Sequence, residues 1–137
     1  MINSRQHHKH AYYLIKNSDL YGLTADEIEM IANIARYHRR ALPHDKHESL
    51  KLLASKNRKT LEVLSALLRI ADGLDRSQFS VIQSLDVKLG RPVVIELQTA
   101  GDPELEIWAA QTRSDLFEKV FRRPVQFLPK SREGVPA

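Results

Sequence analysis

The sequence predicts an α+β fold, in which a mainly helical first part is followed by a small ββαβ part. Up to about residue 78, apolar residues recur at the three- and four-residue spacing of helices. From Val81 to Leu97 they alternate with a period of two, which is typical of strands. Asp102-Pro103-Glu104 then combines a capping residue, a proline and an acid, which marks a helix start. We therefore expect a helical domain over residues 1–78, a ββαβ domain over 79–128 and a disordered tail over 129–137.

Two helices are expected first. The first covers residues 8–17, and its predicted buried face consists of Ala11, Leu14 and Ile15. The second begins with a capping box, because Thr24 is followed three residues later by Glu27. It ends near Arg39-Arg40, where basic side chains favour the negative end of the helix dipole. Its predicted buried stripe consists of Ile28, Ile31, Ala32 and Ala35.

A short helix is expected over residues 48–54, and a long one over 57–74 that we expect to form the central core. The apolar stripe of the long helix consists of Leu61, Leu64, Leu67, Leu68, Ala71 and Leu74. Asp72 lies beside this stripe. A buried carboxylate without a partner is energetically costly, so we expect His38 or an arginine next to it.

The last third is predicted as two strands, a helix and a strand. Residues 81–89 and 93–97 form a hairpin around Gly90-Arg91, with Pro92 tolerated at the start of the second strand. One helix follows from the Asp102 cap and carries Leu105, Trp108, Ala109, Thr112, Leu116 and Val120. The final strand covers residues 125–128.

Composition excludes several classes of protein. The 137 residues include 42% hydrophobic and 28% charged residues, as in globular proteins. The net charge of +4 only weakly favours polyanionic partners. Cysteine is absent, which excludes disulfides and a cysteine nucleophile and fits the cytoplasm. No apolar run approaches the ~20 residues of a membrane span, and the start lacks a signal peptide.

Two clusters of side chains offer chemistry. The HHKH tract, His38 and the acids near Asp72 supply imidazole and carboxylate groups, a workable ligand set for a divalent metal. A capping role for His38 and a structural ion pair for Asp72 are equally open. The basic cluster can bind phosphate through arginine forks or be a solvated face. It consists of Arg5, Lys9, Arg36, Arg39 and Arg40.

Two long segments, QHHKHAYYLIKNSDLYGLTADEIEMIANIARYHRRALP and LSALLRIADGLDRS, resemble the C-terminal part of the exopolyphosphatase / guanosine pentaphosphate phosphatase (Ppx/GppA) family. The resemblance covers roughly residues 2–128, including a W-x(8)-F-x(3)-F spacing in the last helix. It implies an HD-like helical region followed by a small α+β end, and a homodimer.

The resemblance implies that hydrolysis in this family is carried out by N-terminal actin-like lobes, which we do not expect in this chain. We therefore expect no catalytic residue and no cofactor here, with Mg²⁺ serving the parent enzyme. The family's basic channel implies polyphosphate, or another phosphate polyanion, as partner. The residues expected to hold it are Arg5, His8, Lys9, His10, Arg36, His38, Arg39 and Arg40.

The HD-like pattern also implies metal ligands. His7, His38 and Asp72 match its later histidines and its final aspartate. Its central His-Asp pair would stand ahead of the HHKH tract, so we expect an incomplete metal site.

The predicted function is thus a polyphosphate-binding, dimerising module of an exopolyphosphatase or (p)ppGpp phosphohydrolase, with the parent substrate left open. The alternatives are an independent HD-type metal-dependent phosphohydrolase and a purely dimerising scaffold. Nucleic acid is not the expected partner, because no recognition motif accompanies the charge.

Overall fold

The computed structural model describes residues 7–18, 21–37 and 55–130, with residues 7–10 and 55 described by their backbone alone. The chain divides into two compact units, residues 1–69 and 70–137, and the boundary falls inside one helix. The fold class is α+β, as predicted, with helices first and strands in the C-terminal part. Among the described residues, no helix has the length and apolar composition needed to cross a membrane.

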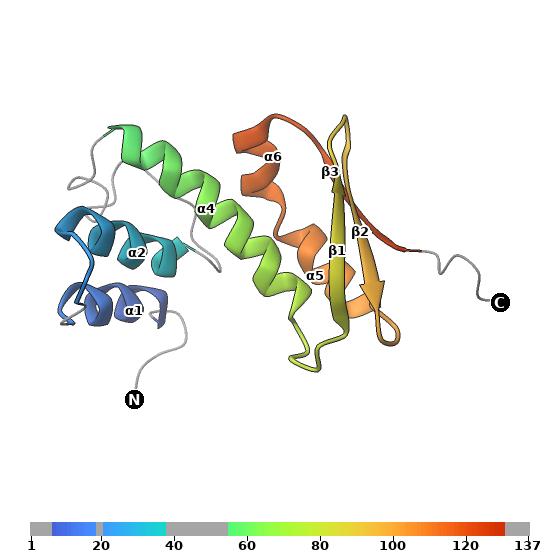
Figure 1. The fold of residues 1–137 in the computed structure, drawn as a ribbon, viewed down its shortest axis with the longest axis horizontal. Helices are drawn as coiled ribbons and strands as arrows, with labels where there is room; N and C mark the ends of the chain where they lie inside the picture. The colour runs from blue at the N-terminus through green and yellow to red at the C-terminus, as the bar shows by residue number, and fades with distance from the viewer. Residues whose placement is uncertain (1–6, 19–20, 38–54, 131–137) are drawn as a thin grey trace, which may run out of the picture. The chain divides into compact units, whose positions relative to one another are not determined.

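The first unit contains α1 (His7–Lys16), α2 (Ala25–Tyr37) and most of α4 (Ser55–Leu74). Helices α1 and α2 pack side by side and run antiparallel (Figure 1). The predicted capping box is confirmed: the Thr24 backbone N–H donates to Glu27 Oε1 at 3.0 Å, and the Glu27 N–H donates to Thr24 Oγ1 at 3.1 Å. The helix predicted over 48–54 lies outside the described residues.

The buried faces of this unit differ from the predicted stripes. Leu14 is 59% exposed and Ile31 37%, whereas Ala32 is fully buried as expected. Polar and aromatic residues are buried in place of these predicted apolar ones. The reason is that hydrogen bonds between side chains join α1 and α2. The residues buried instead are Tyr12, Glu29, Asn33 and Tyr37.

Helix α4 was also expected to bury a continuous leucine stripe, and that prediction is only partly right. Leu61 is buried and packs with Tyr37, against which Met30 and Ile34 also lie. Leu64, Leu67 and Leu68 are 40–47% exposed. The side of α4 that faces inward instead carries Leu61, Ser65, Ala66, Arg69 and Ile70.

The second unit is built on a three-stranded sheet of order β1-β2-β3. Strand β1 (Ile82–Lys88) pairs antiparallel with β2 (Val93–Thr99), and β3 (Val125–Pro129) pairs parallel with β2. The predicted hairpin and final strand are therefore confirmed. Helices α5 (Glu104–Thr112) and α6 (Asp115–Phe121) connect β2 to β3.

Two helices stand where the sequence predicted one, because the chain tightens around Ser114. The backbone N–H groups of Arg113 and Ser114 donate to carbonyls three residues back, at 3.2 and 3.3 Å. The buried Ser114 hydroxyl donates to the Ala110 carbonyl at 2.7 Å. A serine hydroxyl competes with the helical hydrogen-bond pattern in this way, so α5 ends and α6 begins.

The core of the second unit lies on one face of the sheet. Alternate residues of β2 and β3 are buried there together with residues of α5 and α6; they are Val93, Ile95, Leu97, Val125, Phe127, Ala109, Ala110, Leu116 and Phe117. The last turn of α4 crosses α5 closely at Gly73. A Cβ atom added to Gly73 would lie 2.8 Å from the Ala110 Cα, so only glycine fits this crossing.

Candidate functional site

The antiparallel hairpin of α1 and α2 brings together parts of the predicted polyanion-binding set. His8, Lys9 and His10 lie in the first turns of α1, and Arg36 lies in the last turn of α2. Because the two helices run in opposite directions, the start of α1 lies beside the end of α2 (Figure 1). The other four members of the predicted set, Arg5, His38, Arg39 and Arg40, lie outside the described residues.

A buried glutamate fixes this helix pair. Glu29 of α2 is 3% exposed, and the Tyr12 hydroxyl donates to its Oε1 at 2.7 Å. Lys16 forms an ion pair with its Oε2, and Asn33 Nδ2 donates to Oε1 at 3.3 Å. Three donors on two helices therefore converge on one carboxylate, which holds the register of α1 against α2.

The same contacts change the chemistry of Tyr12. Burial raises the pKa of Tyr12 well above its usual range, and its hydrogen bond to Glu29 and the charge of that carboxylate raise it further. The positive charge of Arg36 acts in the opposite direction on this pKa. Arg36 is therefore close enough to interact electrostatically with Tyr12, although it lies about two turns beyond Glu29 on α2.

The end of α2 gathers positive charge. The Arg36 guanidinium lies 5.3 Å from the centre of the Tyr37 ring, within the range of a cation–π contact. The Arg69 side chain, 4% exposed on α4, donates to the Tyr37 carbonyl at 3.3 Å. Both cations stand at the negative end of the α2 dipole, where they are favourably placed.

The net charge of the protein resides in the first unit. Residues 1–69 contain 12 Lys and Arg against 7 Asp and Glu, a net charge of +5. Residues 70–137 contain 9 against 10, a net charge of −1. The excess positive charge is therefore confined to the helical unit, and the sheet unit is close to neutral.

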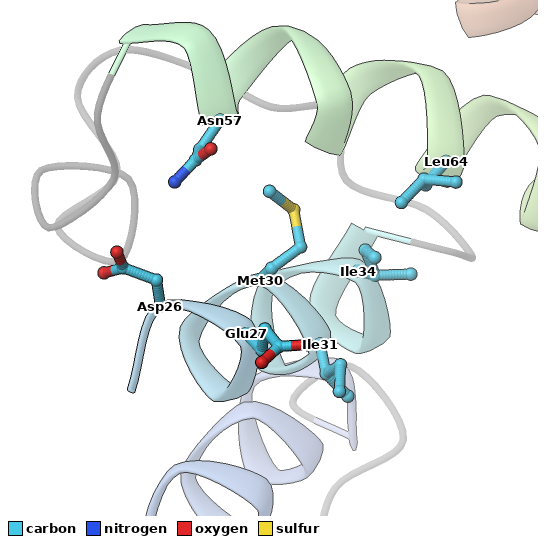
Figure 2. A pocket seen from close by; sticks show the side chains of 7 residues that line it. All are labelled: Asp26, Glu27, Met30, Ile31, Ile34, Asn57 and Leu64. Carbon is cyan, nitrogen blue, oxygen red and sulfur yellow. The ribbon is translucent and has the colours of Figure 1, made fainter. Parts of the chain in front are cut away.

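An open pocket of about 290 Å³ lies between α2 and α4 in the first unit. Figure 2 shows the Met30 side chain rising from α2 toward α4, with Ile34 and Leu64 at one end and Asp26 and Asn57 at the other. The lining is mostly apolar, and it also includes the carboxylate of Glu27. A backbone hydrogen bond from Thr24 lowers the pKa of Glu27 below its ordinary value, which further favours the ionised carboxylate. Two acids beside apolar walls disfavour phosphate in this pocket.

The predicted metal ligands are only partly described. Asp72 forms an ion pair with Arg113 of α5, so the arginine partner expected for it is present. A guanidinium on this carboxylate disfavours a second cation there. Residues 7–18, 21–37 and 55–130 contain no group of three or more potential ligands arranged to hold a metal ion. These residues alone do not fit a metal. The side chain of His7 and all of His38 lie outside the description, and the metal site stays a prediction.

Sequence reasoning missed the residues that organise this end of the unit. Glu29 and Asn33 are polar and fall between predicted apolar positions, so periodicity assigns them to solvent. One signal was present: Tyr12, Lys16 and Glu29 are spaced so that, on two antiparallel helices, donors and acceptor meet across the interface.

A comparison with known protein families identifies a family to which this chain is similar. A family model described as Ppx/GppA phosphatase, domain III, matches residues 1–99. The matched stretch takes in α1, α2, α4 and the β1–β2 hairpin, and it ends at the last residue of β2. It agrees with the resemblance carried by the HHKH and ALLRIADGLD segments.

Proposed function

The chain belongs to the Ppx/GppA phosphatase family, and on this premise we propose that it is a C-terminal module that binds polyphosphate and supports a homodimer. The binding surface consists of the start of α1 and the end of α2. Hydrolysis of the terminal phosphoanhydride belongs to actin-like domains outside this chain.

The observation that carries the proposal is the concentration of charge. The net charge of +5 lies in the helical unit, and α1 and α2 place His8, Lys9 and His10 on the same end of a helix pair as Arg36. The N–H groups at the start of α1 add partial positive charge there. An extended polyanion meets several moderate contacts at this end rather than one deep pocket.

Such a surface serves processivity. Many weak phosphate contacts let a polymer stay bound while its end is cleaved elsewhere, and each contact releases counterions, so affinity falls with salt. Mg²⁺ belongs in this scheme to the hydrolase domains, where it neutralises phosphate charge. We further propose that the protein acts in the cytoplasm, which the absence of cysteine supports.

Calorimetric titration with polyphosphates of increasing length, at two salt concentrations, tests the proposal. We expect affinity to rise with chain length and to fall steeply with salt. A variant carrying Arg36→Gln, Arg39→Gln and Arg40→Gln loses about tenfold or more in affinity, since each lost phosphate contact is worth roughly 1 kcal/mol.

A charge-matched control distinguishes binding at this surface from a general effect of the protein's net charge. The variant Lys59→Gln, Lys119→Gln and Arg123→Gln removes the same three charges from exposed positions on α4, on α6 and before β3. It should bind nearly as well as the unmodified chain. Equal losses in both variants, or no binding at low salt, would contradict a specific surface and favour a purely dimerising scaffold.

A further inference from the structure

The central strand β2 divides its backbone hydrogen bonds between its two neighbours by residue parity. The Val93 N–H donates to the Pro124 carbonyl at 2.9 Å, and the Lys130 N–H donates to the Leu97 carbonyl at 2.7 Å. Odd-numbered residues of β2 thus direct their backbone groups toward β3, and even-numbered residues direct theirs toward β1.

Strand β1 follows from this parity. Asp86 is paired with Glu96, an even-numbered residue of β2, so the two exchange backbone hydrogen bonds. Leu85 and Val87 therefore direct their N–H and C=O groups away from β2. Because β1 is an outer strand, these groups point to an open edge of the sheet.

The apolar side of β1 reaches this edge uncovered. Leu85 is 47% exposed, Val87 50% and Leu89, just after the strand, 83%. Their neighbours in register, Leu97 and Ile95 of β2, are 0% and 7% exposed. One face of the sheet is thus a buried core over β2 and an exposed apolar strip along β1.

The opposite edge of the sheet, at β3, is protected. The Pro124 carbonyl and the Lys130 N–H bond to β2. The backbone N–H and C=O groups of the odd-numbered residues of β3 therefore point away from β2, toward the outer edge of the sheet. Gln111 of α5 donates its side-chain Nε2–H to the outward Val125 carbonyl at 3.2 Å. Pro129 has no N–H to offer another strand. Of the two edges of the described sheet, β1 is therefore the one prepared to accept a further strand.

We infer that β1 is the surface through which two copies of this chain pair, as antiparallel strands about a two-fold axis at Val87. Val87 then lies opposite Val87 of the second copy, and Leu85 opposite Leu89. Asp86 lies opposite Lys88 of the second copy. Within one chain Asp86 already pairs with Lys130 at 2.7 Å and Lys88 with Glu96 at 2.6 Å, so the pairing joins two existing ion pairs across the axis with opposite charges facing each other. The exposed apolar strips join on one face, and the charges pair on the other.

Charge and backbone geometry select this register. A pairing centred on Leu85 would place Lys88 opposite Ile82, and one centred on Asp86 would oppose like charges. The register also shifts between Ile82 and Ser84, where a bulge interrupts β1. Pairing about Val87 uses only residues beyond this bulge, whereas pairing about Leu85 has to cross it.

This inference rests on the dimer included in the proposed function and names its surface. The absence of cysteine makes a direct test available. In a Val87→Cys chain, the two cysteines would lie about 5.5 Å apart between Cα atoms, which suits a disulfide. We expect mild oxidation to link this variant into a dimer. Leu85→Cys, whose cysteines stand roughly 13 Å apart along the strands, and Gln126→Cys on β3 should stay unlinked.

A second variant tests the interface in solution. Val87→Lys sets two lysines directly opposite each other, and by sedimentation equilibrium it should raise the dimer dissociation constant about tenfold or more. Circular dichroism confirms that the variant folds. A dimer unaffected by Val87→Lys, or linked through Leu85→Cys instead, would overturn the inference while leaving dimerisation intact. A monomer at all concentrations would overturn the dimer itself, and polyphosphate titration would still test the binding surface separately.

Discussion

Glu29 in the first unit and Glu106 in the second are equally buried, at 3% and 2% exposure. Glu29 receives hydrogen bonds from Tyr12 and Asn33 and an ion pair from Lys16. Glu106, in the first turn of α5, has an Oε1 with no hydrogen-bond partner among the described residues. The same side chain is thus the organising group of one unit and an incompletely satisfied group in the other.

The difference shows how the two units are held together. Among the side chains described in α1 and α2, few large apolar ones are buried, and hydrogen bonds to the Glu29 carboxylate join the two helices. The sheet unit packs alternating apolar residues of β2 and β3 under two helices, and we expect this packing to persist without the Glu106 carboxylate. Removing each glutamate should therefore have opposite effects on stability.

The largest expected change in stability is the loss caused by Glu29→Leu. This change leaves the buried Tyr12 hydroxyl without its acceptor and Lys16 without its counter-ion, so the free energy of unfolding should fall by about 3 kcal/mol. All four tyrosines lie in residues 1–69, and the single tryptophan, Trp108, lies in the second unit. Urea unfolding followed by tyrosine absorbance and by tryptophan fluorescence measures the loss in each unit.

The control is Glu62→Leu, at a partly exposed glutamate on α4 of the same unit. It should change stability by less than about 0.5 kcal/mol. If Glu29→Leu shifted the tyrosine and tryptophan transitions equally, the two units would unfold as one, and the comparison between them would fail.

The next effect is a dependence on alkaline pH. Because the folded state raises the pKa of Tyr12 above its ordinary value near 10, its contribution to stability is fully present below pH 10. It is lost as the pH rises further, by at most about 1.4 kcal/mol for each pH unit. Denaturation measured between pH 9 and 11 by the tyrosine-independent far-ultraviolet signal should show this decline.

Two tyrosine-to-phenylalanine variants show whether Tyr12 causes this decline in stability. Tyr12→Phe removes the titrating hydroxyl and should flatten the profile above pH 10. Tyr21→Phe, at a side chain that is 94% exposed, should leave it unchanged. A profile that keeps its slope in Tyr12→Phe would mean that another group controls alkaline unfolding.

The smallest effect is expected at Glu106. Replacing this buried carboxylate by a leucine of similar size removes an oxygen without a hydrogen-bond partner and should raise the free energy of unfolding by about 1 kcal/mol. The tryptophan signal reports it. Glu104→Leu, on the exposed side of the same helix turn, is the matched control and should be neutral or slightly destabilising. A clear loss of stability in Glu106→Leu would assign Glu106 a structural partner and remove the contrast with Glu29.

The features that sequence reasoning found are local. The Thr24 and Glu27 capping box, the hairpin around Gly90 and the last strand each depend on neighbouring residues, and all are present. The cost of a buried carboxylate also predicts His38 or an arginine beside Asp72, and the structure has an arginine there. Its identity as Arg113, 41 residues away, depends on how α4 crosses α5 and no local pattern contains it.

The features that it missed depend on partners in three dimensions. Hydrophobic periodicity predicts that Glu29 faces solvent, because it contains no information about the hydrogen-bond donors Tyr12 and Lys16 on the neighbouring helix. It also treats residues 104–121 as one helix, because the Ser114 side chain competes for the Ala110 carbonyl only once it is buried. For the proposed polyanion surface, the sequence indicates the basic residues but not how they are arranged. The antiparallel α1–α2 pair brings the start of α1, with His8, beside the end of α2, with Arg36 (Figure 1).

The mixed sheet has a consequence for the order in which the chain assembles. Lys88 and Val94 pair although they are only six positions apart in the sequence, so the β1–β2 hairpin closes a short loop and can form early. Val93 and Val125 are 32 positions apart in the sequence, so β3 joins only after α5 and α6 have been made. During synthesis the hairpin therefore waits with its central strand open on the side that β3 will occupy. In that interval β2 offers a nascent neighbour a second place to bind, and how soon β3 arrives decides whether the strands pair within one chain or between two.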